Sequence, residues 1–351
     1  MIAPAYDIAQ PYQWNYEHAP LEAPPVEVPV VAGPWNFCGI PLNSPLGVPA
    51  GPLLNSRWIL YYAALGFDVL TYKTVRSSFR ESYELPNLLP VRADSLGREG
   101  LEVVAAGNFA AVRTWAISFG MPSKDPAVWR ADVECARRGM RPGQVLVVSV
   151  VASPQPGWSI EQVAADFARC ASWAAQSGAQ AIEANLSCPN VCTQEGDLYL
   201  LPEASRIVAS AIRSEIVRLP LILKIGLFPS REQAEALIAA VDGIADALST
   251  TNSITAMVKG AAGEPLFGGL KRGIGGAAIA SRCLSETQML ARIIADRGST
   301  LRLISVGGVS SADDVRSRLG AGAHHVQIAT AAMLDPLVAI RIREQLAHEE
   351  G

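Results

Sequence analysis

The sequence predicts an α/β protein built on a closed (β/α)8 TIM barrel. From residue 40 onward, short apolar stretches alternate with amphipathic helical patterns, and eight of these stretches are strand candidates. A regular βα repeat of this count favours a closed barrel over an open doubly wound sheet. An open nucleotide-binding sheet would place a GxGxxG motif after its first strand, but residues 47–52 read Gly-Val-Pro-Ala-Gly-Pro.

The strand candidates are short and apolar, as in the buried strands of a parallel sheet. They cover residues 46–49, 68–73, 145–151, 180–186, 221–225, 246–251, 302–306 and 324–328. Most are followed by a turn and then by apolar residues at helical spacing, most clearly over residues 160–176. Further helices are expected at residues 232–241, 286–295, 312–319 and 336–346.

Two segments fall outside this repeat. Residues 1–35 are rich in proline and tyrosine, which predicts an extended arm lying on the protein's own barrel or on a partner subunit. Residues 36–351 would form the barrel itself. Within them, residues 77–143 are too long for a simple βα connection, and long excursions of this kind are usually lids or binding loops. We expect this lid segment to cover the mouth of the barrel.

Composition and charge exclude several classes of function. Half of the 351 residues are hydrophobic and 18% are charged, which suits a well-buried core. The net charge of −4 is spread along the chain without a basic block, so nucleic acid is not an expected partner. The apolar runs are too short to span a bilayer, and the first residues do not resemble a signal peptide. No membrane association is expected.

The cysteine pattern argues against a metal cluster and against a disulfide framework. No two cysteines form a CxxC pair, so an iron–sulfur or zinc site within the chain is not expected, and no metal is predicted. Their scatter instead suits a reducing cytoplasm. The cysteines are Cys38, Cys135, Cys170, Cys188, Cys192 and Cys283.

The most informative stretch is residues 183–190, which read Glu-Ala-Asn-Leu-Ser-Cys-Pro-Asn. Pro189 cannot continue a strand, so Asn185, Cys188 and Asn190 are delivered together at the carboxyl end of a buried strand. That end is where an α/β barrel carries its chemistry. The alternative is an ordinary loop in which Cys188 is a small buried hydrophobe.

Other polar residues fall at the predicted carboxyl ends of strands. Lys73 closes the second strand, Lys224 lies at the end of the fifth, and Asn252 and Ser253 follow the sixth. A lysine within an apolar strand is costly to bury unless its charge is used, although each could also extend its amine to solvent. Two such lysines together with several asparagines favour a converging polar site.

The last two strands end in segments suited to an anion. Gly307 and Gly308 follow the seventh strand, and Ala329 and Thr330 follow the eighth. Glycines allow close backbone approach, and barrels frequently bind phosphate in the loops after strands seven and eight. A tight turn explains the glycine pair equally well. Phosphate-binding loops, buried lysines and the lack of a metal motif together fit flavin mononucleotide (FMN), with Cys188 as a base.

Taken together, these motifs resemble the dihydroorotate dehydrogenase family, which also includes the flavin domain of dihydropyrimidine dehydrogenase. The resemblance covers about residues 40–346 and centres on Asn-Leu-Ser-Cys-Pro-Asn at residues 185–190. It implies that Cys188 is the catalytic base of the soluble class, with Lys73 beside the substrate. It implies FMN contacts from Ala50, Gly51, Lys73, Thr74, Asn185, Lys224, Gly276, Gly307, Gly308, Ala329 and Thr330. Asn190, Asn252 and Ser253 match residues that hold the pyrimidine ring.

The chain departs from that family in its lid segment. Family members that oxidise dihydroorotate usually carry an asparagine where this chain has Ile117, and Ser118 lies next to it as a candidate substrate contact. Losing one hydrogen bond to a buried polar group costs about 1–3 kcal/mol, enough to change substrate preference. Oxidation of dihydroorotate to orotate is therefore the leading hypothesis. An FMN-dependent enzyme acting on another dihydropyrimidine or a conjugated-carbonyl metabolite, and a non-catalytic barrel subunit, are the alternatives.

The resemblance also bears on partners. We expect a homodimer that binds a small-molecule substrate. The chain contains no iron–sulfur ligand motif, so fumarate, a quinone, oxygen and an electron-transfer partner subunit are all compatible electron acceptors.

Overall fold

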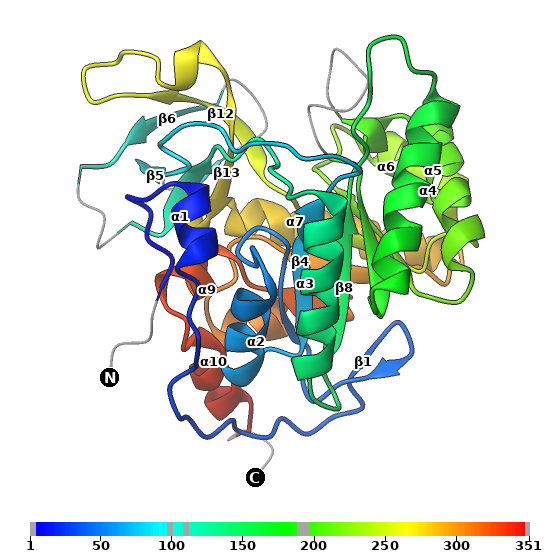
Figure 1. The fold of residues 1–351 in the computed structure, drawn as a ribbon, viewed down its shortest axis with the longest axis horizontal. Helices are drawn as coiled ribbons and strands as arrows, with labels where there is room; N and C mark the ends of the chain where they lie inside the picture. The colour runs from blue at the N-terminus through cyan, green and yellow to red at the C-terminus, as the bar shows by residue number, and fades with distance from the viewer. Residues whose placement is uncertain (1–4, 94, 97–100, 108–111, 188–196, 348–351) are drawn as a thin grey trace.

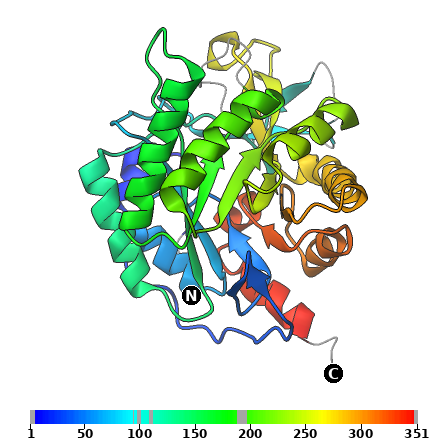
Figure 2. The same cartoon turned by 90° about the vertical axis from the view of Figure 1, so that its right-hand side faces the viewer.

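The computed structural model describes residues 5–93, 95–96, 101–107, 112–187 and 197–347. Its centre is a closed barrel of parallel strands in the order β10-β11-β14-β15-β3-β4-β8-β9, with helices packed around it (Figures 1 and 2). All eight predicted strands occur in this barrel, which confirms the predicted fold class. The strands are β3 (Leu46–Val48), β4 (Val69–Val75), β8 (Val145–Val150), β9 (Ala181–Asn185), β10 (Leu221–Ile225), β11 (Ala247–Thr250), β14 (Arg302–Val306) and β15 (His325–Gln327).

The helices that cover the barrel follow the apolar spacing of the sequence. The predicted helix over residues 160–176 is α4, with the predicted bounds, and the other four expected helices agree to within a few residues except at the start of α7. Helices α2, α3, α5 and α9 were not predicted. The helices of this layer are α2 (Ser56–Ala64), α3 (Pro126–Gly139), α4 (Ile160–Gln176), α5 (Pro202–Ile216), α6 (Arg231–Val241), α7 (Ala280–Asp296), α8 (Ala312–Gly320), α9 (Thr330–Leu334) and α10 (Val338–Ala347).

A second, smaller sheet was not predicted. It has the order β12-β13-β7-β5-β6 and lies above one side of the barrel in Figure 1. Its strands are β5 (Leu88–Arg92), β6 (Glu102–Ala105), β7 (Thr114–Ile117), β12 (Ile254–Lys259) and β13 (Arg272–Gly276). Gly276, which the resemblance implies as an FMN contact, is the last residue of β13. Three of the strands come from the predicted lid segment, whereas α3 from the same segment packs against α2 and α4 as a barrel helix.

The N-terminal arm packs against its own barrel. A short helix, α1 (Tyr12–Glu17), interrupts the expected extended chain. Tyr6 and Tyr12 are buried, and both rings make edge contacts with Phe119 of the lid segment. Further along, the hairpin of β1 (Asn36–Phe37) and β2 (Ile40–Pro41) places Phe37 against the apolar lower layer of the barrel interior. The arm and hairpin thus contact both ends of the barrel.

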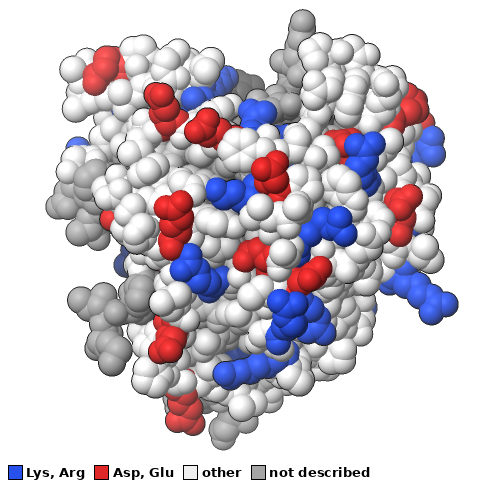
Figure 3. All heavy atoms as spheres, in the orientation of Figure 1, with Lys and Arg blue, Asp and Glu red and all other residues white. Residues whose placement is uncertain are grey.

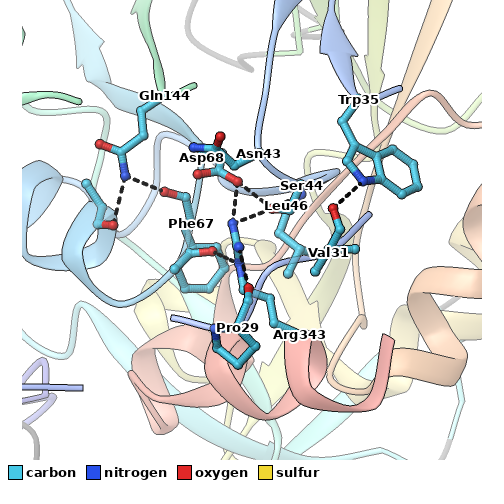
Figure 4. A network of polar contacts seen from close by, with 12 residues as sticks. Pro29, Val31, Trp35, Asn43, Ser44, Leu46, Phe67, Asp68, Gln144 and Arg343 are labelled. Carbon is cyan, nitrogen blue, oxygen red and sulfur yellow. Dashed lines mark hydrogen bonds and ion pairs between the residues drawn. The ribbon is translucent and has the colours of Figure 1, made fainter. Parts of the chain in front are cut away.

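Buried polar groups lie beneath the barrel as well as above it. Arg343 of α10 forms an ion pair with Asp68, and the same carboxylate accepts a hydrogen bond from Ser44 Oγ at 2.6 Å (Figure 4). Arg343 also donates to the backbone oxygen of Pro29 at 2.9 Å, which joins the arm to α10. This network of hydrogen bonds and one ion pair stabilises the lower end of the barrel.

The outer surface carries both signs of charge. Figure 3 shows Lys and Arg side chains interspersed with Asp and Glu over the viewed face. No helix within the described ranges is long and apolar enough to cross a membrane.

Candidate active site

Three buried polar side chains lie near the carboxyl ends of neighbouring barrel strands. Lys73 of β4, Asn185 of β9 and Lys224 of β10 are 7%, 6% and 5% exposed. Asn185 and Lys224 are directly paired in the register of β9 and β10, so both occur at one level of the barrel. The structure therefore gathers the two predicted lysines and the predicted asparagine at the end of the barrel that carries chemistry.

Lys224 is held inside the barrel by a hydroxyl and by a nearby carboxylate. Its Nζ donates to Ser249 Oγ on β11 at 3.2 Å. Burial lowers the pKa of Lys224 below its ordinary value, and the charge of Glu183 on β9 opposes that shift. Glu183 is itself 2% exposed. The pair places a titratable cation and a carboxylate below the mouth of the barrel.

Asn185 is the centre of a small hydrogen-bonded cluster. Asn252 Nδ2 donates to Ser187 Oγ at 2.7 Å and approaches Asn185 Oδ1 at 3.4 Å, and Ser187 Oγ donates to Asn185 Oδ1 at 3.3 Å. These contacts fix the orientation of both carboxamides. Ser253, next in the chain, lies beside Gly273, because a Cβ built on that glycine would come within 2.3 Å of Ser253 Oγ.

The lid segment closes over this cluster. Phe119 lies above Lys73, with 5.9 Å between the ring centroid and Nζ. Asn185 Nδ2 donates to Met121 Sδ at 3.7 Å. Gly120 between them has a positive φ of 72°, which glycine adopts without steric cost, and this turn brings both side chains down toward the barrel. Phe119 and Met121 of the predicted lid segment therefore contact the polar residues at the strand ends.

The strand β4 is irregular where it carries its functional residues. The pairing of β4 with β8 shifts between Tyr72 and Val75, which bracket Lys73 and Thr74. Such irregularities redirect side chains and are frequent beside active sites. Thr74 Oγ1 consequently contacts Ser149 Oγ of β8 at 3.0 Å.

A cavity of about 320 Å3 opens beside the asparagine cluster. It lies between β13 and the loops that follow β14 and β15, and Asn252 of the cluster forms part of its wall. Its wall includes the predicted residues Asn252, Gly276, Gly307, Gly308, Ala329 and Thr330, together with Ile117, Arg113 and Gly275. Six predicted residues from four distant parts of the chain therefore share one cavity.

The remaining predicted residues are placed differently. Ala50 and Gly51 form the turn after β3, which is connected to β4 by a hydrogen bond from Lys73 N to Leu53 O at 2.8 Å. Ser118 is buried and accepts a hydrogen bond from Arg272 Nε at 2.8 Å. Cys188 and Asn190 lie outside the described residues.

The glycines at this site are required by close packing. Gly307 and Gly308 have φ values of 111° and 76°, and Cβ atoms built on them would lie 2.6 Å from Cys283 Sγ and 2.5 Å from Ala280 Cα. A Cβ on Gly275 would enter the space between Ile117 Cδ1, at 3.1 Å, and Thr330 Oγ1, at 3.5 Å. Side chains at these positions would displace the loops or fill the cavity.

The sequence profile of the family described as Dihydroorotate dehydrogenase matches residues 34–349. The chain belongs to the dihydroorotate dehydrogenase family. It is 33% identical over 328 residues to Dihydroorotate dehydrogenase of Dictyostelium discoideum, a match that covers 87% of this chain and 86% of that protein. Membership of this family makes the protein an oxidoreductase that acts on a CH–CH group.

A second relative and a solved structure extend the comparison. The catalytic subunit of Dihydroorotate dehydrogenase B (NAD(+)) from Thermodesulfovibrio yellowstonii is 33% identical over 168 residues, which cover 48% of this chain and 53% of that protein. The crystal structure of DHODH from Eimeria tenella in complex with ferulenol aligns with a TM-score of 0.72 at 17% identity, covering 96% of this chain and 89% of that one. This last likeness supports the shared fold.

Several residues of the site were not predicted. Glu183, Ser187 and Met121 contact or approach the predicted polar residues, and Arg113 and Gly275 line the cavity. Glu183 could have been predicted from the sequence, because a carboxylate inside an apolar strand is costly to bury without a cation nearby. Met121 and Arg113 could not have been, because their positions depend on the unpredicted second sheet.

Proposed function

We propose that this protein is an FMN-dependent oxidoreductase that oxidises dihydroorotate, or a close analogue, to its unsaturated product. The observation that most supports this proposal is that a buried polar cluster adjoins a cavity bounded by glycine loops. Buried Asn185, which is paired in register with Lys224, contacts Asn252, and Asn252 lines the cavity bounded by the glycine loops. A flat, polar ring joined to a phosphate needs such a combination of polar cluster and anion-binding loop.

The residues around the cavity fit FMN in shape and in chemistry. The loops at Gly307, Gly308 and Thr330 would hold the phosphate, because their backbone can approach an anion closely. Lys73 and Lys224 would offer positive charge to the ring, and Asn185 a carboxamide. Ala50, Gly51, Thr74, Gly276 and Ala329 complete the proposed contacts.

Bound FMN would supply the ring that accepts a hydride from a substrate carbon. Cys188 would take the proton from the neighbouring carbon. One C–H bond on each of the two carbons would then be broken, and a double bond would form between them. A free thiol has a pKa near ~8.5, and a nearby cation such as Lys73 favours the thiolate that acts as the base. Asn190, Asn252 and Ser253 would hold the substrate ring, with the lid segment excluding water above it.

A second candidate function is oxidation or reduction of another dihydropyrimidine or a conjugated-carbonyl metabolite. The observation that favours it is Ile117, which contributes an apolar side chain to the cavity wall where the family resemblance implies an asparagine. The adjacent Ser118 is already engaged by Arg272. A substrate group at this position would meet an apolar surface.

The two candidates are separated by anaerobic absorbance spectra of the purified protein. We expect a yellow protein whose flavin absorbance bleaches on addition of dihydroorotate. Bleaching by dihydrouracil or another dihydropyrimidine, but not by dihydroorotate, would instead establish the second candidate. Dithionite provides the control that the bound flavin can be reduced.

A colourless protein that does not bind added FMN would overturn both candidates and support a non-catalytic barrel. Two further parts of the proposal concern its setting. We propose a cytoplasmic homodimer, from the cysteine pattern and the family resemblance, and sedimentation of the purified protein tests the dimer. Mixing the reduced protein with fumarate, a quinone or oxygen identifies which acceptor restores the yellow colour.

A further inference from the structure

Behind the Gly307–Gly308 loop lies a buried arginine that the proposed chemistry does not use. Arg318 of α8 is 2% exposed. Its NH2 group donates to the backbone oxygens of Gly307 and Ala280, both at 2.7 Å, and its NH1 group donates to Ser305 Oγ at 3.2 Å. One guanidinium thus connects the end of β14, the start of α7 and α8.

No carboxylate lies within 4 Å of Arg318 in the part of the chain that the structure describes. A buried cation is costly unless a negative charge compensates it. Its guanidinium donates to carbonyl and hydroxyl oxygens, which are neutral. Asp314 of the same helix attracts the Arg318 charge without forming an ion pair with it. Among the described residues the protein therefore keeps a positive charge without an ion-pair partner behind one wall of the cavity.

The hydrogen bond to Gly307 also determines the direction of the next backbone N–H. The peptide bond between Gly307 and Gly308 is trans. In a trans peptide the C=O and the N–H point in opposite directions. Because the Gly307 oxygen faces Arg318, the Gly308 N–H faces away from it, toward the side on which both glycines line the cavity. Among the described residues this N–H has no hydrogen-bond acceptor.

We infer that Arg318 is a positioning residue for the phosphate of the cofactor: it holds the Gly307–Gly308 loop so that the Gly308 N–H meets the phosphate, and its charge stabilises that anion from behind. The inference rests on the proposed function. A cation that donates to Gly307 O also polarises the peptide and strengthens the Gly308 N–H as a donor. Arg318 itself does not touch the reacting atoms.

The test compares two flavins that differ in the phosphate. Apoprotein, prepared from the full chain by removing bound flavin, is titrated with FMN and with riboflavin while flavin fluorescence is followed. In Arg318→Met we expect FMN to bind at least about tenfold more weakly, with little change for riboflavin, since only FMN carries the phosphate. Arg318→Lys keeps the charge but loses the planar guanidinium with its several donors. The FMN affinity of this variant should lie between those of wild type and Arg318→Met.

Arg213→Met is the matched control. Arg213 also donates to backbone oxygens, those of Ile244 at 2.9 Å, Leu219 at 2.8 Å and Val217 at 3.3 Å, but at the opposite end of the barrel, where it forms an ion pair with Asp246 as well. Its loss should leave FMN and riboflavin affinity unchanged. Equal weakening of both flavins in Arg318→Met, or unchanged FMN affinity in both Arg318 variants, would overturn the inference. If Arg318→Met does not fold, Arg318→Lys decides by the same comparison.

The wild-type titration separates this inference from the proposed function. Wild-type protein that binds neither flavin contradicts the proposed function and, with it, the role of Arg318. Wild-type protein that prefers FMN over riboflavin, together with Arg318 variants that keep this preference in full, leaves the proposed function intact and contradicts only the role of Arg318.

Discussion

Two buried arginines at opposite ends of the barrel face different electrostatic surroundings. Arg343 at the base and Arg318 near the mouth are each 2% exposed. Arg343 is neutralised by Asp68, whereas Arg318 donates to neutral oxygens and has no carboxylate within 4 Å among the described residues. Both arginines donate hydrogen bonds inside the protein, but among the described residues only Arg343 has an ion-pair partner. The difference indicates that the base is built for stability and the mouth for meeting an anion.

The same division runs through the barrel interior. The lower layer is apolar and is covered by Phe37 of the β1–β2 hairpin. The upper layer contains Lys224, Glu183 and Asn185, whose burial costs free energy that apolar residues would not. Proteins accept such costs mainly at functional sites. Substitutions at the two ends should therefore separate activity from stability.

The largest effect is expected for Cys188→Ala, which removes the proposed base. Removing the base should slow reduction of the flavin by substrate at neutral pH by roughly 10²–10⁴-fold, while the protein stays yellow and its melting temperature stays within about 2 °C. Anaerobic stopped-flow absorbance measures the rate, and the flavin content of the purified variant is the control. A variant that is reduced as fast as wild type would remove Cys188 from the proposed mechanism.

The next largest effect is a loss of stability, expected at the lower end of the barrel for Arg343→Met. This change leaves Asp68 as a buried carboxylate without its cation, so the free energy of unfolding should fall by about 3–5 kcal/mol in urea denaturation. The FMN affinity of the folded protein should not change. The double variant Asp68→Asn with Arg343→Met removes both charges and should lose less stability than Arg343→Met alone. A larger loss in the double variant would contradict this account of the pair.

A smaller, pH-dependent effect is expected for His325 in the barrel interior. Burial lowers the pKa of His325 to about 3. The unfolded chain binds a proton at this side chain below pH ~6.5 and the folded protein does not, so stability falls as the pH falls from there. The loss reaches about 2 kcal/mol at pH 5.

His325→Leu should remove that loss, so that its free energy of unfolding falls by about 2 kcal/mol less than that of wild type between pH 7 and pH 5. Urea denaturation at both values gives the comparison. Between pH 7 and pH 8 the two proteins should change in parallel, because the imidazole is neutral in both states. The same loss in both proteins below pH 7 would show that other groups cause the acid sensitivity.

Much of the site was predictable because its residues occupy the ends of strands. Lys73, Asn185 and Lys224 follow apolar runs whose length and spacing already indicate buried parallel strands. The glycine pair after β14 and Thr330 after β15 were found by their places in the repeat. Ile117 was noticed as a departure, although its position on the cavity wall was not known.

The barrel, its eight strands and five of its helices could be predicted from the amino-acid pattern, because strand and helix periods are local properties of the chain. The second sheet depends on long-range packing, since it pairs Met257 with Glu102 and Gly273 with Ile117 across distances in the chain that no local pattern encodes. The tertiary structure also decided the partner of Arg318. A basic residue on a helix face reads as solvent-exposed until the neighbouring loop and helix close over it.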